Sequence, residues 1–426
     1  MRIHILKLER FRGAQSLSLE LHERLNVFVG LNGAGKSSIL DATAILLSWM
    51  VNRVKHAGAS GRPITEPDIR NGESWANIHV TCSDNGRSWD WNLIKVRKGY
   101  RKPKYTATTL TLLTEAAQEI QMKISENNGR INLPLFAYYP VNRAVLDIPL
   151  RIRERHSFDL FSAYDESLTS GANFRTFFEW FREREDLENE NRRYINALLK
   201  PEGFQFPDPH LEAVRNALGQ FLPEFTNLAV RRNPLRMEVE KNDQRLTVNQ
   251  LSDGEKCLMA MIGDLARRMS IANPLRTNPL EGEGIVLIDE IDLHLHPMWQ
   301  RMVIPKLVEV FPNCQFLIST HSPHVVTHVQ PKNLFLLSMT TGGLVALRPS
   351  ESYGMTVERI LEDLMGLETT RPDDVKNAIR KIYEQIDSGE LTEAKDSIGK
   401  LVKRIGQDPD LVKATVLIKR KELIGK

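Results

Sequence analysis

The chain has 426 residues, of which 41% are hydrophobic and 26% are charged. A single hydrophobic core stops growing below this length, so we expect two or three lobes. The 57 Lys and Arg residues against 54 Asp and Glu residues give a net charge of +3, which excludes a uniformly basic surface for nucleic acid or acidic lipid. The three cysteines are scattered without metal-type spacing, which excludes a disulfide framework and a zinc site. The N-terminus lacks a signal sequence and no apolar run of about 18 residues occurs, so the expected location is the cytoplasm, with no membrane partner.

The chain opens with a strand, a glycine-rich loop and a helix. Residues 3–11 and 16–30 alternate like strands, and residues 36–50 carry apolar side chains at helical spacing. Between them, the stretch GLNGAGKS at residues 30–37 fits the phosphate-binding pattern G-x-x-x-x-G-K-[ST] in the strand-to-helix context that the pattern requires. The glycines allow backbone N–H groups to close around phosphate oxygens, Lys36 reaches the β and γ phosphates, and the Ser37 hydroxyl ligates Mg²⁺. We expect ATP to be bound by Asn32, Gly33, Ala34, Gly35, Lys36, Ser37 and Ser38.

A hairpin and a basic segment follow. Residues 76–96 form two extended runs around a DNG turn signal, which predicts a β-hairpin. The next stretch, KVRKGYRKPK at residues 95–104, has six basic residues in ten, and residues 151–156 add more. Such side chains can displace counterions from a nucleic-acid backbone, so Lys98, Arg101 and Lys102 are candidate DNA contacts. The alternative is a solvated loop with no ligand.

Residues 151–225 turn helical and charged, which predicts a helical insertion that lacks coiled-coil heptads. Strand patterns return at residues 228–232 and 236–241. The stretch LSDGEK at residues 251–256 then precedes an apolar helix, with Ser252 where an N-cap residue belongs. Taken alone, this hexapeptide is an ordinary helix cap.

Two buried strands then end in polar residues. GIVLIDEID at residues 284–292 ends in Asp289 and Glu290, which places Asp289 where it can hold Mg²⁺ through water and Glu290 where it can polarise an attacking water. The catalytic candidates from these residues are Glu290 and Lys36. His321 lies at the tip of the strand in FLISTHSP, residues 316–323, where a lone histidine is usually structural, and it joins the catalytic candidates only through the family resemblance given below. The metal candidates are Ser37 and Asp289.

The nearby DLHLHP segment offers His294 and His296 as metal ligands. Alternate residues on one short segment make a poor metal site, so we favour a loop at a dimer seam.

The remaining residues, from about 353 onward, read as helices. They lack the alternating strands and terminal D-x-D pair of a toprim nuclease, and an H-N-H pattern is missing from the sequence. If nucleic acid is cut, we expect another chain to cut it.

The glycine loop, LSDGEK, LIDE and STH, in that order, resemble the Walker A, signature, Walker B and H-loop of ATP-binding-cassette ATPases. The resemblance implies an α/β fold, an ABC-type P-loop ATPase head with a helical insertion and a C-terminal helical region. It also implies a head-to-tail homodimer, in which Ser252 and Gly254 contact the γ-phosphate held by the neighbour's Lys36, His321 senses that phosphate and Asp292 lies in the D-loop. The corresponding division is an N-terminal ATPase lobe at residues 1–145, the insertion at 146–230, a second ATPase lobe at 231–348, and a partner or oligomerisation region at 349–426.

Two features depart from that pattern. Asp253 occupies the place of a glycine, so it either turns away and caps the helix or weakens ATP-driven closure. An obvious Q-loop glutamine is missing, and Arg143 in LFAYYPVNRA is the candidate substitute.

More narrowly, GLNGAGKSSILDA, LSDGEK and DEIDLHLHP resemble the AAA ATPases related to the SMC and overcoming-lysogenization-defect proteins. AYYPVNR, FFEWFREREDLENE and the tail resemble the ATPase subunit of Septu-type anti-phage defence systems, also found with some retrons. The resemblance implies an ATP-hydrolysing regulatory subunit that controls a small HNH endonuclease acting on DNA. The alternatives are a DNA repair ATPase of the SMC and RecF type, and a nucleotide-sensing scaffold with little turnover. The trigger, the nucleic-acid target and the stoichiometry stay open.

Overall fold

The computed structural model describes residues 1–84, 86–101, 107–141, 158–169, 172–196, 199–201 and 204–424. The chain forms two compact units, Met1–Val357 and Glu358–Lys426. The division therefore falls inside the region that the sequence assigned to C-terminal helices, residues 349–426. None of the helices in the described ranges is both long and apolar enough to cross a membrane.

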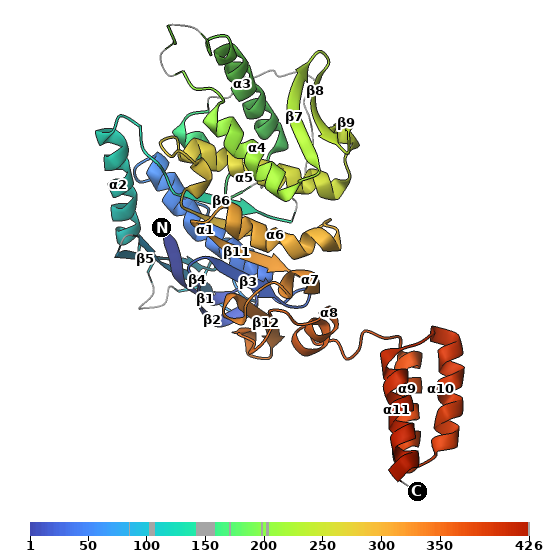
Figure 1. Ribbon diagram of the computed structural model, residues 1–426. Helices are drawn as coiled ribbons and strands as arrows, with labels where there is room; N and C mark the ends of the chain where they lie inside the picture. Colours follow the sequence, from blue (N-terminus) through green and yellow to red (C-terminus); the bar gives the residue numbers. More distant parts are fainter. Residues whose placement is uncertain are drawn as a thin grey trace. The chain divides into compact units, whose positions relative to one another are not determined.

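A six-stranded sheet forms the centre of the first unit (Figure 1). Its strand order is β13-β12-β3-β11-β10-β6, and all neighbours are parallel except the β12–β13 pair. The central strands are buried at every residue, as expected for a parallel sheet that is covered on both faces. The strands are β3 (Leu25–Val29), β6 (Leu135–Tyr139), β10 (Gly284–Ile288), β11 (Cys314–Thr320), β12 (Leu334–Thr340) and β13 (Gly343–Leu347).

A four-stranded antiparallel sheet, in the order β2-β1-β4-β5, lies beside the first helix. It contains β1 (Arg2–Phe11), β2 (Ala14–Glu20), β4 (Trp75–Asp84) and β5 (Arg87–Val96). The β4–β5 pair confirms the predicted hairpin, and β4 alternates buried and half-buried residues along most of its length. Helix α1 (Lys36–Lys55) contacts β4, β6, β10 and β11, and α2 (Thr111–Glu126) packs on α1 and β5. A short 3-10 turn, η1 (Glu66–Asp68), precedes β4.

The helical insertion is followed by a small sheet (Figure 1). The insertion contains η2 (Leu160–Tyr164), α3 (Phe174–Arg192) and α4 (Pro209–Phe221), and the sheet contains β7 (Phe225–Arg232), β8 (Leu235–Lys241) and β9 (Gln244–Thr247). Helix α5 (Asp253–Ala272) contacts η2, α3, α4 and β6, and all but two of its residues are buried. The remaining elements are η3 (Val248–Gln250), η4 (Pro279–Glu281), α6 (Pro297–Val310), α7 (Pro323–Val326), η5 (Pro331–Asn333), α8 (Val357–Arg359) and the π-helical η6 (Ile360–Leu364).

The second unit contains a bundle of three helices, α9 (Asp373–Ser388), α10 (Leu391–Ile405) and α11 (Pro409–Ile424). The bundle has a hydrophobic core of its own, because one apolar face of each helix points inward. The buried core residues are Ile382, Ile386, Ala394, Ile398, Leu401, Leu411, Ala414 and Ile418. The chain thus has the predicted fold class, a mixed α/β head followed by C-terminal helices.

Candidate nucleotide-binding site

Three neighbouring strands of the sheet, β3, β11 and β10, end at the same edge. The glycine loop follows β3, His321 follows β11 and Asp289 follows β10. Strand β11 lies between β3 and β10, and its register pairs Thr320 with Val29 and Ile318 with Ile288. The residues that follow these three parallel strands therefore meet at their carboxyl ends. That edge is where α/β sheets bind their ligands.

The loop after β3 requires glycines for two reasons: positive backbone φ angles, and close contact with the β12–β13 hairpin. Gly33 and Gly35 adopt φ values of 79° and 86°, which disfavour any other residue. A side chain at Gly35 would also meet the Leu344 side chain at 2.8 Å, and one at Gly30 would collide with the Leu337 carbonyl oxygen. The β12–β13 hairpin therefore closes against the loop, which leaves the loop's backbone free to surround a phosphate group.

Lys36 begins α1 with its side chain inside the loop. Its Nζ donates to the carbonyl oxygens of Gly30 at 2.8 Å and Leu31 at 3.2 Å, and the residue is 5% exposed. Burial lowers the Lys36 pKa, while Asp289, Glu290 and Asp292 oppose that shift. One cation thus faces three carboxylates, an excess of negative charge that fits a divalent cation bound together with a nucleotide.

The other expected ATP-binding residues lie around Lys36. Asn32 and Gly33 are exposed on the loop, while Ala34 is buried and its N–H donates to the Leu31 carbonyl oxygen at 3.1 Å. Ser37 is exposed and Ser38 half-buried in the first turn of α1. The N–H groups of a helix's first turn have no partner within the helix, so this end of α1 offers donors to an anion.

Asp289 and Glu290 are held by Ser319 on the neighbouring strand. The Ser319 hydroxyl donates to Asp289 Oδ1, and the Glu290 N–H donates to the Ser319 hydroxyl oxygen at 2.8 Å. The Asp289 N–H donates to the Tyr139 carbonyl oxygen at 2.8 Å, which extends the β10–β6 pairing by one residue. Glu290 has a φ of 48°, so the chain leaves the sheet direction at this residue.

His321 lies beside the Glu290 carboxylate. Its Nε2 is 3.9 Å from Glu290 Oε1. Asp292 fixes the backbone there, since its Oδ1 accepts from Thr320 Oγ1 at 2.6 Å and from the His321 N–H at 3.3 Å. Burial and the nearby Lys36 lower the His321 pKa, against the opposing effect of the three carboxylates. The imidazole is therefore mostly neutral at pH 7.

The signature residues form the N-terminus of α5. Ser252 is the N-cap residue, and a capping box joins it to Glu255, whose carboxylate also pairs with Lys241. Asp253 turns outward, with a side chain that is 84% exposed and 3.4 Å from Lys256 Nζ. Asp253 is turned away, as in the first alternative, but the expectation that it caps the helix is wrong, because Ser252 is the N-cap residue.

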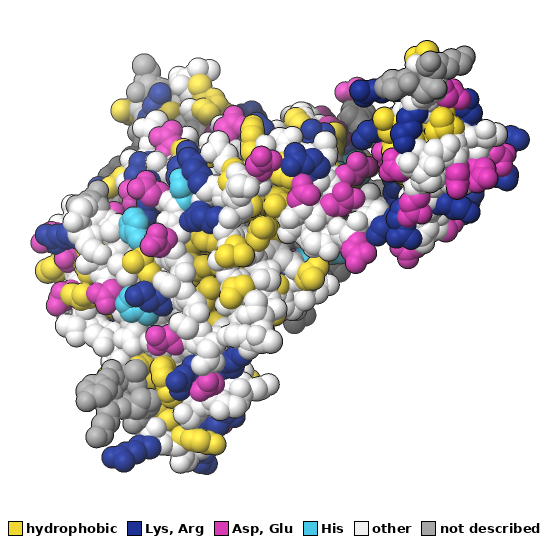
Figure 2. All heavy atoms as spheres, turned by 90° about the horizontal axis from the view of Figure 1, so that it is seen from below, with side chains coloured by type: hydrophobic (Ala, Val, Ile, Leu, Met, Phe, Trp, Pro, Cys, Tyr) yellow, Lys and Arg dark blue, Asp and Glu magenta, His cyan; other side chains and the backbone are white. Residues whose placement is uncertain are grey.

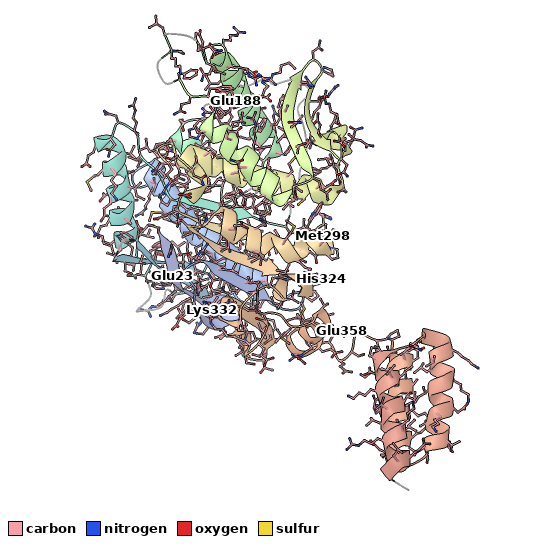
Figure 3. All side chains as sticks on the ribbon, in the orientation of Figure 1. Glu23, Glu188, Met298, His324, Lys332 and Glu358 are labelled. Carbon is pink, nitrogen blue, oxygen red and sulfur yellow. The ribbon has the colours of Figure 1, made fainter. Side chains whose placement is uncertain are left out.

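Gly254, in the signature, packs against the segment of residues 291–296 that follows Glu290. A side chain at this position would collide with the carbonyl oxygen of His294, and the Trp299 ring would lie 3.5 Å away. His294 has a φ of 61°. His296 is the N-cap residue of α6, beside Met298, which lies exposed at the start of that helix (Figure 3). Within the described ranges, groups of three or more metal-ligating side chains are absent, so His294 and His296 have no third ligand there.

The candidate DNA contacts lie in the loop after β5. Lys98 and Arg101 are exposed, and the Lys98 N–H donates to Glu66 at 3.0 Å. Lys102, Arg143 and residues 151–156 lie outside the described residues. On the face shown in Figure 2, basic and acidic side chains are interspersed.

Sequence reasoning missed a second charge cluster on α1. Arg12, in the turn between β1 and β2, pairs with Asp41 and Asp68, and Arg62 also pairs with Asp41. Asp41 lies one helical turn after Ser37. These residues are far apart in the sequence, which gives no signal for the cluster. Arg12 has a φ of 46° in the turn.

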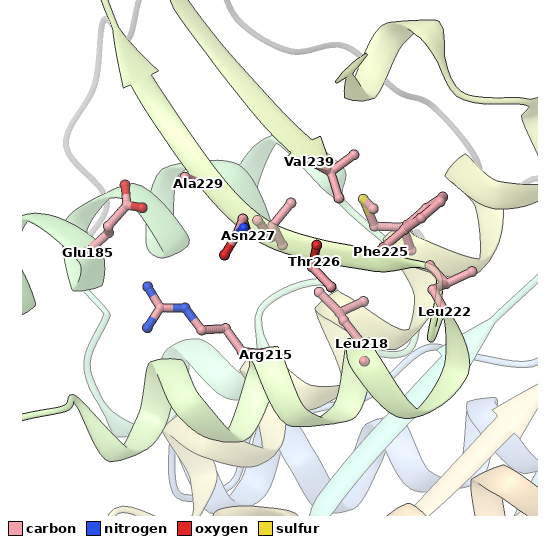
Figure 4. Close-up of a pocket in the computed structure, with 12 residues that line it drawn as sticks. Glu185, Arg215, Leu218, Leu222, Phe225, Thr226, Asn227, Ala229 and Val239 are labelled. Carbon is pink, nitrogen blue, oxygen red and sulfur yellow. The ribbon is translucent and has the colours of Figure 1, made fainter. Parts of the chain in front are cut away.

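A separate cavity of about 530 Å³ lies between α4 and β7 (Figure 4). Glu185 and Arg215 lie at one end, and Leu218, Leu222 and Phe225 at the other. Its charged groups already have partners, since Arg215 pairs with Glu188 and Glu185 accepts from the Val230 N–H. Among the described residues, this cavity therefore offers a ligand no free charge.

Comparison with known proteins places the chain among the AAA ATPases. Residues 112–327 match the family described as "AAA domain, putative AbiEii toxin, Type IV TA system", and residues 1–86 match "AAA ATPase domain". The chain is 24% identical over 397 residues to the Septu protein PtuA of Bacillus thuringiensis, covering 90% of this chain and 88% of that protein. It also resembles a solved SMC head bound to the C-terminal winged-helix domain of ScpA, with a TM-score of 0.46 and 16% identity over 82% of this chain and 98% of that one.

A retron protein of Escherichia coli gives a stronger match. The chain is 32% identical over 455 residues to "Retron Ec83 probable ATPase", covering 93% of this chain and 82% of that protein. Identity at this level over most of both chains establishes common descent. The chain therefore belongs to the AAA ATPase family that includes the retron ATPases.

Proposed function

We propose that this protein is the ATP-binding and ATP-hydrolysing regulatory subunit of an anti-phage defence complex, and that it controls an HNH nuclease partner acting on DNA. The observation that carries the ATPase part is the convergence of Lys36, Asp289, Glu290 and His321 on one sheet edge. The relatives among retron and Septu proteins support the defence part.

Each residue at that edge has a chemical task. Lys36 and the first turn of α1 hold the phosphates of ATP, while Ser37 and Asp289 are the residues that would hold Mg²⁺. When bound, Mg²⁺ offsets the negative charge of the phosphates. Glu290 accepts a proton from the attacking water. His321, 3.9 Å from Glu290, senses the γ-phosphate that this water attacks.

The signature residues act on a second copy of the chain. Ser252 is exposed at the start of α5, with its hydroxyl close to the Glu255 carboxylate. In a head-to-tail homodimer this end of α5 faces the ATP bound by the other copy. Helix α5 and the segment containing Asp292 would then respond together, because Gly254 packs against the His294 carbonyl.

Replacing Glu290 with Gln tests the proposed activity. We expect Glu290→Gln to bind ATP as tightly as the wild type and to lose turnover by about 100-fold or more, since the amide cannot accept the proton. Binding is measured by equilibrium dialysis and turnover by phosphate release. Glu309→Gln, which removes an exposed carboxylate on α6, is the matched control and should retain full turnover. Full turnover by Glu290→Gln would rule out Glu290 as the base.

Co-expression with the HNH subunit tests the partner. We expect the two chains to co-purify, and DNA cleavage by the complex to differ between the wild type and Glu290→Gln. A nuclease that cleaves alike with either ATPase variant would contradict the regulatory role. DNA-stimulated ATP turnover without any partner would favour the repair ATPase instead.

A further inference from the structure

The middle of α5 carries a buried charge cluster. Asp264 is fully buried, and its two carboxylate oxygens each accept at 2.7 Å, Oδ1 from Arg267 and Oδ2 from Arg268. Burial alone would raise the Asp264 pKa, but the two arginines hold it below its usual value. Asp264 is therefore a fixed negative charge inside the protein.

Tyr139, the last residue of β6, joins this cluster to the nucleotide site. Its hydroxyl donates to Asp264 Oδ2 at 3.0 Å, and its carbonyl oxygen accepts from the Asp289 N–H at 2.8 Å. Tyr139 is 1% exposed, and burial raises its pKa well above the usual value, so the hydroxyl stays a donor. One buried residue thus touches both α5 and the backbone of Asp289.

We propose that Tyr139 is a positioning residue that transmits the position of α5 to Asp289 and Glu290. The inference rests on the proposed ATPase function and adds a means of regulating that site. When the start of α5 engages ATP on a second copy, the helix shifts as a rigid body. The Asp264–Tyr139 bond then carries that shift to the end of β6, and the Tyr139 carbonyl carries it to Asp289.

The geometry favours transmission over simple packing. Arg268 fixes the opposite side of the cluster, because its NH1 donates to the carbonyl oxygens of Ala163 and Asp165, both at 2.8 Å. The cluster is therefore held on one side by η2 and on the other by Tyr139. Close-packed interiors pass small displacements onward because they have no room to absorb them.

Tyr139→Phe tests the proposal in the full-length chain, with Tyr164→Phe as the matched control. Tyr164 is also buried, and its hydroxyl donates to the Pro134 carbonyl oxygen at 2.6 Å. Each substitution removes one buried hydroxyl near β6, so both should lower the urea midpoint, Tyr139→Phe by more because its hydroxyl bonds to a carboxylate. Only Tyr139→Phe should lower kcat, by about tenfold, with KM for ATP unchanged and weaker cooperativity in ATP concentration.

Equal kcat values for the wild type and both variants would overturn the inference while leaving the proposed ATPase function intact. A wild type without turnover would instead refute the proposed function. If Tyr139→Phe does not fold, hydrogen exchange of the wild type gives the answer. ATP should increase protection in α5 and in β6 together, and a change confined to α5 would also overturn the inference.

Discussion

His321 is influenced by Lys36 and by three carboxylates, and its protonation links the site to pH. Burial and Lys36 lower its pKa in the folded state, against the opposing carboxylates. The unfolded chain therefore binds a proton at the His321 imidazole more tightly than the folded chain does. The folded state then loses stability relative to the unfolded state as pH falls through about 6.5 toward the lower folded pKa.

His321→Asn removes that titration. We expect the urea midpoint of the wild type to fall more than that of His321→Asn between pH 8 and pH 5.5. Only the wild type has an imidazole that is harder to protonate in the folded state than in the unfolded state. Parallel pH dependence of the two midpoints would show that His321 titrates alike in both states. The comparison uses one buffer series for both proteins.

At the same scale, sequence reasoning proposed the site residues that belong to local motifs. Lys36, Asp289, Glu290 and His321 each directly follow a strand or loop signal, and the parallel topology brings them together. It missed Ser319 and Tyr139, because each acts through a contact with a strand that is distant in sequence. A single sequence contains no signal for such contacts.

Helix α5 and the segment after Glu290 form the element-scale link in the site. Gly254→Ala should destabilise the protein by about 1–3 kcal/mol, because the added methyl group collides with the His294 carbonyl and the segment must shift. The free energy of unfolding in urea measures the loss. Gly219→Ala on α4 is the control, since a side chain there meets no atom within 4 Å and alanine favours a helix.

We also expect Gly254→Ala to lower ATP turnover even where Lys36 still binds ATP, because the displaced segment includes Asp292. Full stability and full turnover together would mean that the segment adapts to the methyl group. A stabilised Gly219→Ala beside a destabilised Gly254→Ala would assign the effect to the contact itself.

Most strands and helices follow from sequence periodicity, and the exceptions have physical reasons. Strands β10 and β11 are short apolar runs that end in polar residues, so they were predictable. Strand β9 has four residues and, within the described part of the chain, pairs with β8 alone, which leaves little pattern to detect. The buried Arg267 and Arg268 contradict the expectation that charges lie outside, because Asp264 provides a partner that is visible only in three dimensions.

At the scale of the whole molecule, the second unit has an apolar surface that its own core does not use. Helix α11 buries Leu411, Ala414 and Ile418 in the bundle. On its other side, Val412, Val416 and Leu423 are 54%, 59% and 78% exposed. Their spacing of four and seven residues places them on one line along the helix.

The charges beside that line restrict which kind of surface can bind there. Lys413, Lys419 and Arg420 are exposed beside the apolar residues. Pairing two copies of α11 would bring these like charges together, which disfavours a symmetric contact. An amphipathic helix with acidic flanks fits better, and we propose that such a helix of the nuclease partner in the proposed complex covers this surface.

Val416→Glu tests that assignment, with Thr415→Glu as its control. Both substitutions add one negative charge to an exposed residue of α11, but only Val416 lies on the apolar line. We expect Val416→Glu to weaken binding of the HNH subunit by about tenfold or more, since a central apolar contact is lost and the added carboxylate repels an acidic helix. Thr415→Glu should bind normally, and both variants should hydrolyse ATP at the wild-type rate because the nucleotide site lies in the first unit.

Equal retention of the nuclease by both variants in co-purification and titration would show that the partner binds elsewhere. Loss of self-association by Val416→Glu would instead identify a second copy as the occupant.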